Sequence, residues 1–281
     1  MKLQLLSDLH LEVHPHFSPS PAPGADLLVL AGDIGSYQPG SLLADDDFGL
    51  ARFSPLPQYA GWPTPVVFVP GNHEYDGQDF DAAHARLRRT CDRLGLIWLE
   101  RESLVMDGVR LVGTTLWSDF DALADHHDLT DMALRLKQRS KAFRAADFYL
   151  SKTGTTRHGE PFLAAQLREL GLACQAWLRQ ALAQPFDGPT VAITHFAPSL
   201  RSADPRYGLM PGTAGFCSAL DGLLPYAQLW LHGHLHAPSD YCADGLHADG
   251  RRWACRVVAN PLGYARKGEQ DAFLQHCVVA V

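Results

Sequence analysis

The chain has 281 residues and lacks any apolar stretch approaching the roughly 18 uninterrupted residues of a membrane span. Its first residues, MKLQLLSDLHLEV, contain one lysine, a short apolar run and early acidic residues, which is not the pattern of a signal peptide. The six cysteines lack any C-x-x-C spacing, the usual mark of a redox or zinc motif. We therefore expect reduced, mostly packed thiols in a cytoplasmic protein.

Basic residues are in the minority. Lys and Arg number 24 against 31 Asp and Glu, a formal net charge of −7, which argues against a general nucleic-acid binder. This balance is compatible with a local positive site for a small anionic substrate. The chain has no internal repeat and no low-complexity tract, and its length accommodates one large α/β domain or two small ones.

Five short apolar runs each stop at a polar cluster. They are KLQLL (2–6), DLLVLA (26–31), PVVFVP (65–70), TVAIT (190–194) and LWL (229–231). Because both faces of each run are apolar, they predict strands of a covered sheet. Helical spacing recurs at 79–95, where Gly95 is the expected terminator, and at 161–182. This alternation predicts an α/β layered fold, in which ligands bind beyond the carboxyl ends of the strands.

The rest of the chain contributes further strands and one insertion. Strands are expected at 109–117, 256–264 and 273–281, and residues 119–160 form an insertion with a helical stretch at 131–150. The basic residues of that stretch spread around the helix, which favours a solvated cap over a phosphate-binding face. They are Arg135, Lys137, Arg139, Lys141 and Arg144.

Histidine is plentiful, with 14 in the chain. The stretch LWLHGHLH (229–236) places His232, His234 and His236 at alternate positions, on one face of an extended chain. One such histidine is usually a satisfied core or surface residue, whereas several on one face suggest a metal. The stretch alone leaves both interpretations open.

The polar clusters follow in a distinctive order. D-x-H (Asp8, His10) is followed by G-D (Gly32, Asp33), G-N-H-E (71–74), a strand-end His195 and G-H-x-H (233–236). Together they resemble the calcineurin-like metallophosphoesterase superfamily. The resemblance implies a single domain over 1–281, built as a four-layer α/β/β/α sandwich of two mixed sheets flanked by helices. The insertion at 119–160 would then be a helical cap near the active site.

Carried over residue by residue, the resemblance implies two divalent metal ions. One would be held by Asp8, His10 and His236 and the other by Asn72, His195 and His234, with Asp33 bridging both. Oxygen and imidazole ligands favour Mn²⁺ first, with Fe, Zn²⁺, Ni²⁺ and Mg²⁺ as alternatives. The family frame selects His234 and His236 from the stretch 229–236 and gives His232 a packing or supporting role.

The implied activity is that of a dinuclear metal-dependent phosphohydrolase. It would cleave phosphomonoesters or phosphodiesters by in-line attack of a metal-bound hydroxide. His73 would be the general acid for the leaving group, Glu74 would orient its neighbours, and Asn72 would also contact the substrate.

One departure narrows the substrate class. After Asp33 the chain reads IGSY (34–37), without the Asp and Arg that support the catalytic histidine and grip phosphate in Ser/Thr protein phosphatases. The segments 195–208 and 257–264 look instead like a prokaryotic-type branch. We expect Arg201 and Arg206, in the loop after His195, to bind phosphate oxygens. The alternative is a solvent-facing loop with one arginine paired to Asp204.

Two other functions are weighed against this one. A nuclease of the same superfamily is favoured by the basic helix at 135–144 and disfavoured by the overall acidity. A metal-free scaffold protein would have no use for the complete set of ligands. The expected partner is a small phosphate ester, with no membrane contact, and the sequence does not determine the oligomeric state.

Overall fold

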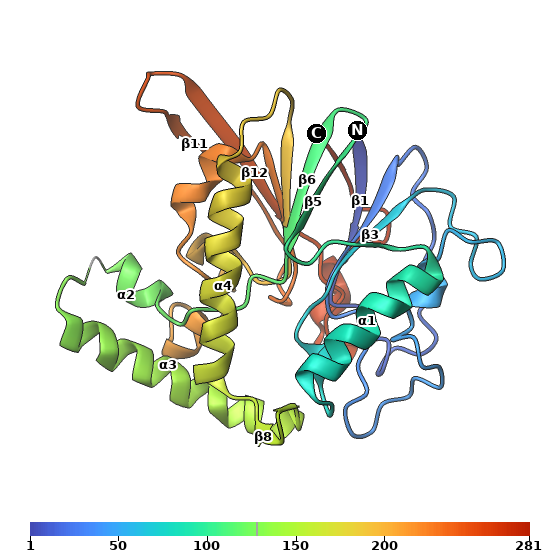
Figure 1. Cartoon of the computed structure of the whole chain (residues 1–281), viewed down its shortest axis with the longest axis horizontal. Coiled ribbons are helices and arrows are strands. Elements are labelled where there is room, and N and C mark those ends of the chain that lie inside the picture. Colours follow the sequence, from blue (N-terminus) through green and yellow to red (C-terminus); the bar gives the residue numbers. More distant parts are fainter. Residues whose placement is uncertain (128) are drawn as a thin grey trace.

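The computed structural model describes residues 1–127 and 129–281. Two mixed sheets pack against each other at its centre (Figure 1). The first has the strand order β13 (Val278–Ala280), β1 (Lys2–Leu6), β2 (Leu27–Ala31), β3 (Val66–Val69) and β4 (Ile97–Trp98). The second has the order β11 (Ser239–Leu246), β12 (Arg252–Ala259), β10 (Leu229–His232), β9 (Thr190–Thr194), β6 (Val109–Thr114) and β5 (Glu102–Met106). Parallel central strands are thus flanked by antiparallel strands β13, β5 and β11.

Alternate residues of each strand pack into two different cores, which is why the runs are apolar on both faces. Leu5 of β1 and Ile193 of β9 belong to a core that draws its buried residues from both sheets. Leu6 of β1 and Trp230 of β10 belong instead to the core shared with the helices. Since burying one large apolar side chain contributes about 1.5–3 kcal/mol, both faces stabilise the sheets.

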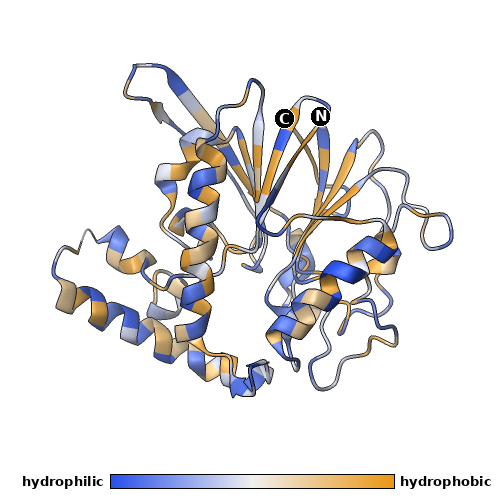
Figure 2. Cartoon of the chain, viewed as in Figure 1, coloured by the Kyte–Doolittle hydropathy of each residue, from blue (hydrophilic) through white to orange (hydrophobic). Residues whose placement is uncertain are grey.

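Helices α1 (Phe80–Leu94) and α4 (Ala164–Ala183) cover the outer faces of the two sheets (Figure 1). The Asp79 side chain caps α1 by accepting the amide of Ala82, and Gly95 ends it with a φ of 69°, as predicted. Figure 2 shows hydrophobic residues along the strands and mixed hydropathy along the helices. The four-layer α/β/β/α class is therefore confirmed.

Several predicted strand bounds were wrong. The run 109–117 forms a strand only to Thr114, because the chain leaves the sheet there: Thr115 donates its amide to Glu100, and Leu116 has a φ of 56°. The run 256–264 lies partly in β12, which begins at Arg252 because it pairs with β11. Only 278–280 of the run 273–281 is a strand. Strands β5 and β11 escaped prediction because they are half-exposed, so polar residues interrupt their apolar pattern.

The insertion at 119–160, apart from residue 128 outside the described part, holds α2 (Ala122–His126), α3 (Met132–Thr153) and the pair β7 (Thr156–Arg157) and β8 (Glu160–Pro161). Helix α3 packs against η4 (Pro211–Gly215) and α4. Arg139 pairs with Asp121 at 2.7 Å and Arg135 with Asp125 at 2.6 Å. Two of the five basic residues thus join α3 to its neighbours.

Within the described residues, no helix combines the length and the apolar character that crossing a membrane requires. All six cysteines are free thiols, and four of them are buried, as expected of packing residues: Cys91, Cys174, Cys217 and Cys255.

Candidate metal centre

The polar clusters converge beyond the carboxyl ends of strands β1, β2, β3, β9 and β10. Three overlapping groups of side chains bring their ligand atoms within 4.8 Å of one another. These groups are Asp8, His10 and His236; His10, Asp33 and His73; and Asp33, His195 and His234. Asn72 joins them through its Oδ1 atom, 3.1 Å from Nε2 of His195. The structure therefore brings together all the side chains predicted as ligands.

Asp8, His10 and His236 form one side of the centre. The Nε2 atoms of the two imidazoles lie 3.1 Å apart, and Nε2 of His236 lies 3.6 Å from Oδ1 of Asp8. Each ring is held through its other nitrogen, His10 by Glu12 at 2.9 Å and His236 by Glu269 at 2.6 Å. A carboxylate on Nδ1 orients the ring and leaves Nε2 free to bind a metal.

Neither Glu12 nor Glu269 was predicted from the sequence. Glu12 carries a local signal, because it lies two residues after His10. Glu269 carries none, since it begins the separate turn η7 (Glu269–Ala272) and reaches His236 only through the tertiary fold.

Asp33, His195, His234 and Asn72 form the other side. Nε2 of His195 lies 3.2 Å from Oδ2 of Asp33, and its Nδ1 lies 2.8 Å from the carbonyl oxygen of Ala31. Asp33 also accepts the backbone amide of His73 through Oδ1, at 2.8 Å. Asp33 belongs to two of the three groups, which is the position a bridging carboxylate needs.

His234 supplies the observation that points most directly to a metal. Its Nε2 is buried and has no hydrogen-bond partner among the described residues. Its ring stacks on Phe196, with ring centroids 3.9 Å apart. A buried polar atom without a partner costs about 1–3 kcal/mol, a cost that a bound cation would remove. The donor set of imidazole, carboxylate and amide suits a borderline or hard divalent cation, so the residues present fit the implied metals.

Backbone strain marks four of the ligand-type residues. Asp8, His10, Asp33 and His234 have φ angles of 52°, 46°, 54° and 67°. Residues other than glycine seldom adopt this left-handed backbone conformation, and each one that does raises the free energy of the folded state by on the order of 1–3 kcal/mol. A side chain at Gly233 would also place a Cβ 2.6 Å from Oδ2 of Asp8, which explains the glycine of G-H-x-H. The fold accepts this strain where the ligands meet.

The ionisable groups of the centre shift one another's pKa. Burial alone would lower the pKa of His195, but the Asp33 carboxylate outweighs it and raises that pKa to about 9. Burial would raise the pKa of Asp33, but the imidazoles of His195 and His73 hold it well below its usual value. Burial, reinforced by His195, keeps the pKa of His234 well below its usual value. In the metal-free protein these shifts favour an anionic Asp33 and a neutral His234, the forms that bind metals, while His195 holds a proton that a bound cation would displace.

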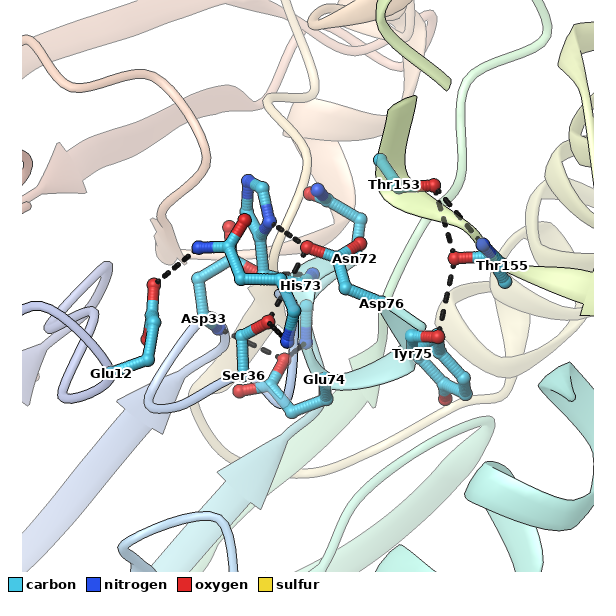
Figure 3. A network of polar contacts seen from close by, with 12 residues as sticks. Glu12, Asp33, Ser36, Asn72, His73, Glu74, Tyr75, Asp76, Thr153 and Thr155 are labelled. Atoms are coloured by element: carbon cyan, nitrogen blue, oxygen red, sulfur yellow. Dashed lines mark hydrogen bonds and ion pairs between the residues drawn. The ribbon is translucent and has the colours of Figure 1, made fainter. Parts of the chain in front are cut away.

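His73 lies beside the ligands and is paired with an acid that the sequence reasoning missed. Its Nδ1 lies 2.5 Å from Oδ2 of Asp76 (Figure 3). The turn η2 (His73–Tyr75) places these side chains, three residues apart, on one side. The His73 side chain is 23% exposed and that of Asp76 is 2% exposed. Burial opposes the shift, but Asp76 and Asp33 raise the pKa of His73 well above its usual value.

Glu74 joins two of the motif loops. Its carboxylate accepts the backbone amides of Ile34 at 2.6 Å, Gly71 at 2.7 Å and Asp33 at 3.1 Å. This is the orienting position expected for it. His232 belongs to none of the three groups, and its Nε2 lies 3.0 Å from Oγ of Ser202. Burial lowers the pKa of His232 to about 4, as in a packed, neutral histidine.

The two arginines expected at the substrate have partners elsewhere. Arg206 makes three side-chain hydrogen bonds to Asp204, the shortest 2.7 Å long. Arg201 donates to the carbonyl oxygen of Cys242 and lies over the Tyr241 ring, 4.3 Å from its centroid. The pairing of Arg206 with Asp204 matches the alternative considered for this loop.

A C-terminal segment beyond the last motif also borders the centre. The Tyr264 ring stacks on His10, with centroids 4.3 Å apart, and meets His236 at 5.0 Å. Gly263 donates its amide to the carbonyl oxygen of Asp8 at 3.0 Å, and Glu269 accepts the amide of Tyr264 at 2.8 Å. The apolar and polar patterns of this segment did not indicate the contact.

Comparisons with known proteins point the same way. The family model described as calcineurin-like phosphoesterase matches residues 1–238. The uncharacterized protein L509 of Acanthamoeba polyphaga mimivirus is 23% identical over 216 residues, which cover 72% of this chain and 69% of that protein. The crystal structure of phosphopantetheinyl hydrolase from Mycobacterium tuberculosis aligns with a TM-score of 0.64 and 22% identity, over 95% of this chain and 90% of that chain. The structural likeness shows a shared fold.

Proposed function

The chain belongs to the calcineurin-like phosphoesterase family and is a metal-dependent phosphoesterase, and from this premise we propose that it hydrolyses small phosphomonoesters or phosphodiesters at a two-metal centre. One observation carries the proposal. Ligand-type side chains from five separate loops converge on a site where Nε2 of His234 is buried without a partner among the described residues.

We assign the ligands to two cations that share one carboxylate. Asp8, His10 and His236 would hold one, and Asn72, His195 and His234 the other, with Asp33 between them. Two divalent cations bound there would lower the pKa of a water molecule and offset the negative charge of the phosphoryl group. Mn²⁺ is the first choice for these ligands, and Fe, Zn²⁺, Ni²⁺ and Mg²⁺ are the alternatives to be compared.

His73 would protonate the leaving-group oxygen. Its Nδ1 is occupied by Asp76, so Nε2 is the nitrogen that can carry a proton to the substrate. Partial exposure of the His73 side chain allows contact with a bound ester, while buried Asp76 keeps the ring oriented. In Ser/Thr protein phosphatases an Asp after the second motif supports the catalytic histidine, and IGSY (34–37) lacks it here. Asp76 would supply that support to His73 instead.

Asn72, Arg201 and Arg206 are the proposed contacts to the substrate. Asn72 is the best placed, because its amide already faces His195. Arg206 is 51% exposed, and its pKa is raised first by Asp204 and more weakly by Glu269. Its guanidinium is held at the surface by Asp204. It would exchange Asp204 for a phosphate oxygen when an ester binds.

Neither alternative function is favoured by the structure. Arg135 and Arg139 of the basic helix pair with Asp125 and Asp121, which leaves less charge for a nucleic acid. A metal-free scaffold gives no reason for the buried Nε2 of His234, which has no partner in the described part of the chain. We also propose a cytoplasmic location, because free thiols suit a reducing compartment.

A metal-reconstituted substrate screen tests the function. Metal-free protein is loaded with Mn²⁺, Fe²⁺, Zn²⁺, Ni²⁺ or Mg²⁺ and assayed on phosphomonoesters, phosphodiesters and cyclic nucleotides. A pantetheine phosphodiester belongs in the panel because of the name of the structural neighbour. We expect hydrolysis that requires the metal and stops on chelation. Metal-replete protein that hydrolyses no ester of the panel would contradict the proposal.

A further inference from the structure

The end of α3 meets the loop that carries Asp76. We call residues 153–156 the junction, because they join α3 to β7, and residues 75–79 the dyad loop, because they contain Asp76, the partner of His73. The two segments are far apart in sequence. Figure 3 shows Thr153 and Thr155 of the junction beside Tyr75, on one side of the His73–Asp76 pair.

Three hydrogen bonds connect the junction to the dyad loop. Gly77 donates its amide to the carbonyl oxygen of Thr153 at 2.8 Å, and Thr156 donates its amide to that of Gln78 at 3.0 Å. The Thr155 hydroxyl donates to the carbonyl oxygen of Tyr75 at 3.2 Å. These bonds bracket Asp76 on both sides along the chain.

Thr155 is the buried centre of the junction. It is 8% exposed, and its hydroxyl lies 3.1 Å from that of Thr153. A crevice is lined in part by Asn72, Asp76 and Thr155, so the junction borders a space that it shares with two groups of the site.

Among the described residues, the Asp76 side chain has little other support. Besides His73, its Oδ2 accepts a hydrogen bond from the Ser36 hydroxyl, and this bond is 3.4 Å long. A bond of this length is weak, so the backbone of the dyad loop must set the position of the carboxylate. The three hydrogen bonds from the junction hold that backbone from outside the motif.

We propose that the junction positions Asp76 for His73 and that Thr155 is its central positioning residue. The insertion then governs protonation of the leaving group, in addition to any role as a cap. The kinetic part of this inference rests on the proposed function, whereas the effect on the His73–Asp76 hydrogen bond does not.

The hydrogen bond is tested first, in metal-free protein, by NMR of the imidazole N–H protons. The bond between Nδ1 of His73 and Asp76 predicts a low-field resonance that is absent in His73→Ala. Thr155→Val keeps the shape and removes the hydroxyl, so the resonance should broaden or move. Thr155→Ser keeps the hydroxyl and should restore it. Ser151→Ala, a hydroxyl deletion at an exposed position of α3 away from the dyad loop, is the matched control and should match the wild type.

Kinetics then test the consequence. With the metals loaded, Thr155→Val should lower kcat for an alkyl phosphate by about 3- to 10-fold, the range expected for one neutral hydrogen bond. The rate for nitrophenyl phosphate should change by less than about twofold, because that leaving group needs no proton. In the Asp76→Asn background the same substitution should add nothing, because the junction acts through Asp76.

Two results would overturn the inference. One is a Thr155→Val spectrum identical to that of the wild type. The other is an equal loss of rate on both substrates, which would indicate general loosening of the fold. If the spectra change as expected while the wild-type protein hydrolyses no ester, the junction keeps its positioning role and the proposed function fails.

Discussion

Replacing Asp76 by Asn removes the negative charge that faces His73 and keeps the size of the side chain at position 76. The hydrogen bond concerned is 2.5 Å long, and Asp76 is 2% exposed, so water does little to screen it. A hydrogen bond to a charged group contributes about 1.5–3 kcal/mol. At about 1.4 kcal/mol per tenfold change in rate, Asp76→Asn should lower kcat for alkyl phosphates about 10- to 150-fold.

The assay compares two leaving groups on metal-loaded protein. The loss should be large for an alkyl phosphate and small for nitrophenyl phosphate, since only the poor leaving group needs a proton from His73. Metal content should equal that of the wild type, because Asp76 is not one of the assigned ligands and contacts His73 instead. Asp92→Asn, an exposed acid on α1, is the control. Unchanged rates, or equal losses on both substrates, would refute the role given to Asp76.

Three further outcomes follow from the same geometry. His73→Ala should keep the metals and lose roughly 10²–10⁴-fold in rate on alkyl phosphates, and a smaller loss on nitrophenyl phosphate would support the acid role. Glu269→Gln should weaken metal binding about 10- to 100-fold in a chelator competition, because His236 loses the carboxylate that orients it. An unaltered metal affinity would show that Glu269 does not orient His236 for metal binding. In metal-free protein, the free energy of unfolding should fall as the pH rises from 6.5 to about 9, because the folded state holds the His195 proton more tightly than the unfolded state does. Urea titrations at several pH values check this, and His195→Gln should flatten the slope.

The sequence predicted which side chains gather at one edge of the sheets, because each motif is local. Asp8, Asp33 and His195 lie one or two residues after buried apolar strands, and parallel strands bring such positions to one edge. The same runs predicted covered strands in an α/β layered fold, since strands apolar on both faces require cover on both sides, whereas the arrangement of two sheets in four layers was implied by the family resemblance. Here the physical signal is contained in a few neighbouring residues.

Contacts between distant segments could not be predicted in this way. Glu269 reaches His236 through a turn with no motif, and Thr155 reaches Tyr75 across the insertion. The edge strands β5 and β11 were hidden by their exposed polar residues. Asp76 is the intermediate case: it lies three residues after His73, but pairing required the helical turn that only the structure shows.

Metal stoichiometry of the wild type and of Asp33→Asn tests the central claim most directly. Asp33 belongs to two of the three ligand groups, and the substitution keeps its size while removing the charge that two cations would share. After reconstitution with Mn²⁺, elemental analysis should find about two ions per wild-type chain and a loss of both in Asp33→Asn. A wild-type chain that binds no metal, or an Asp33→Asn chain with full metal content and activity, would contradict the account.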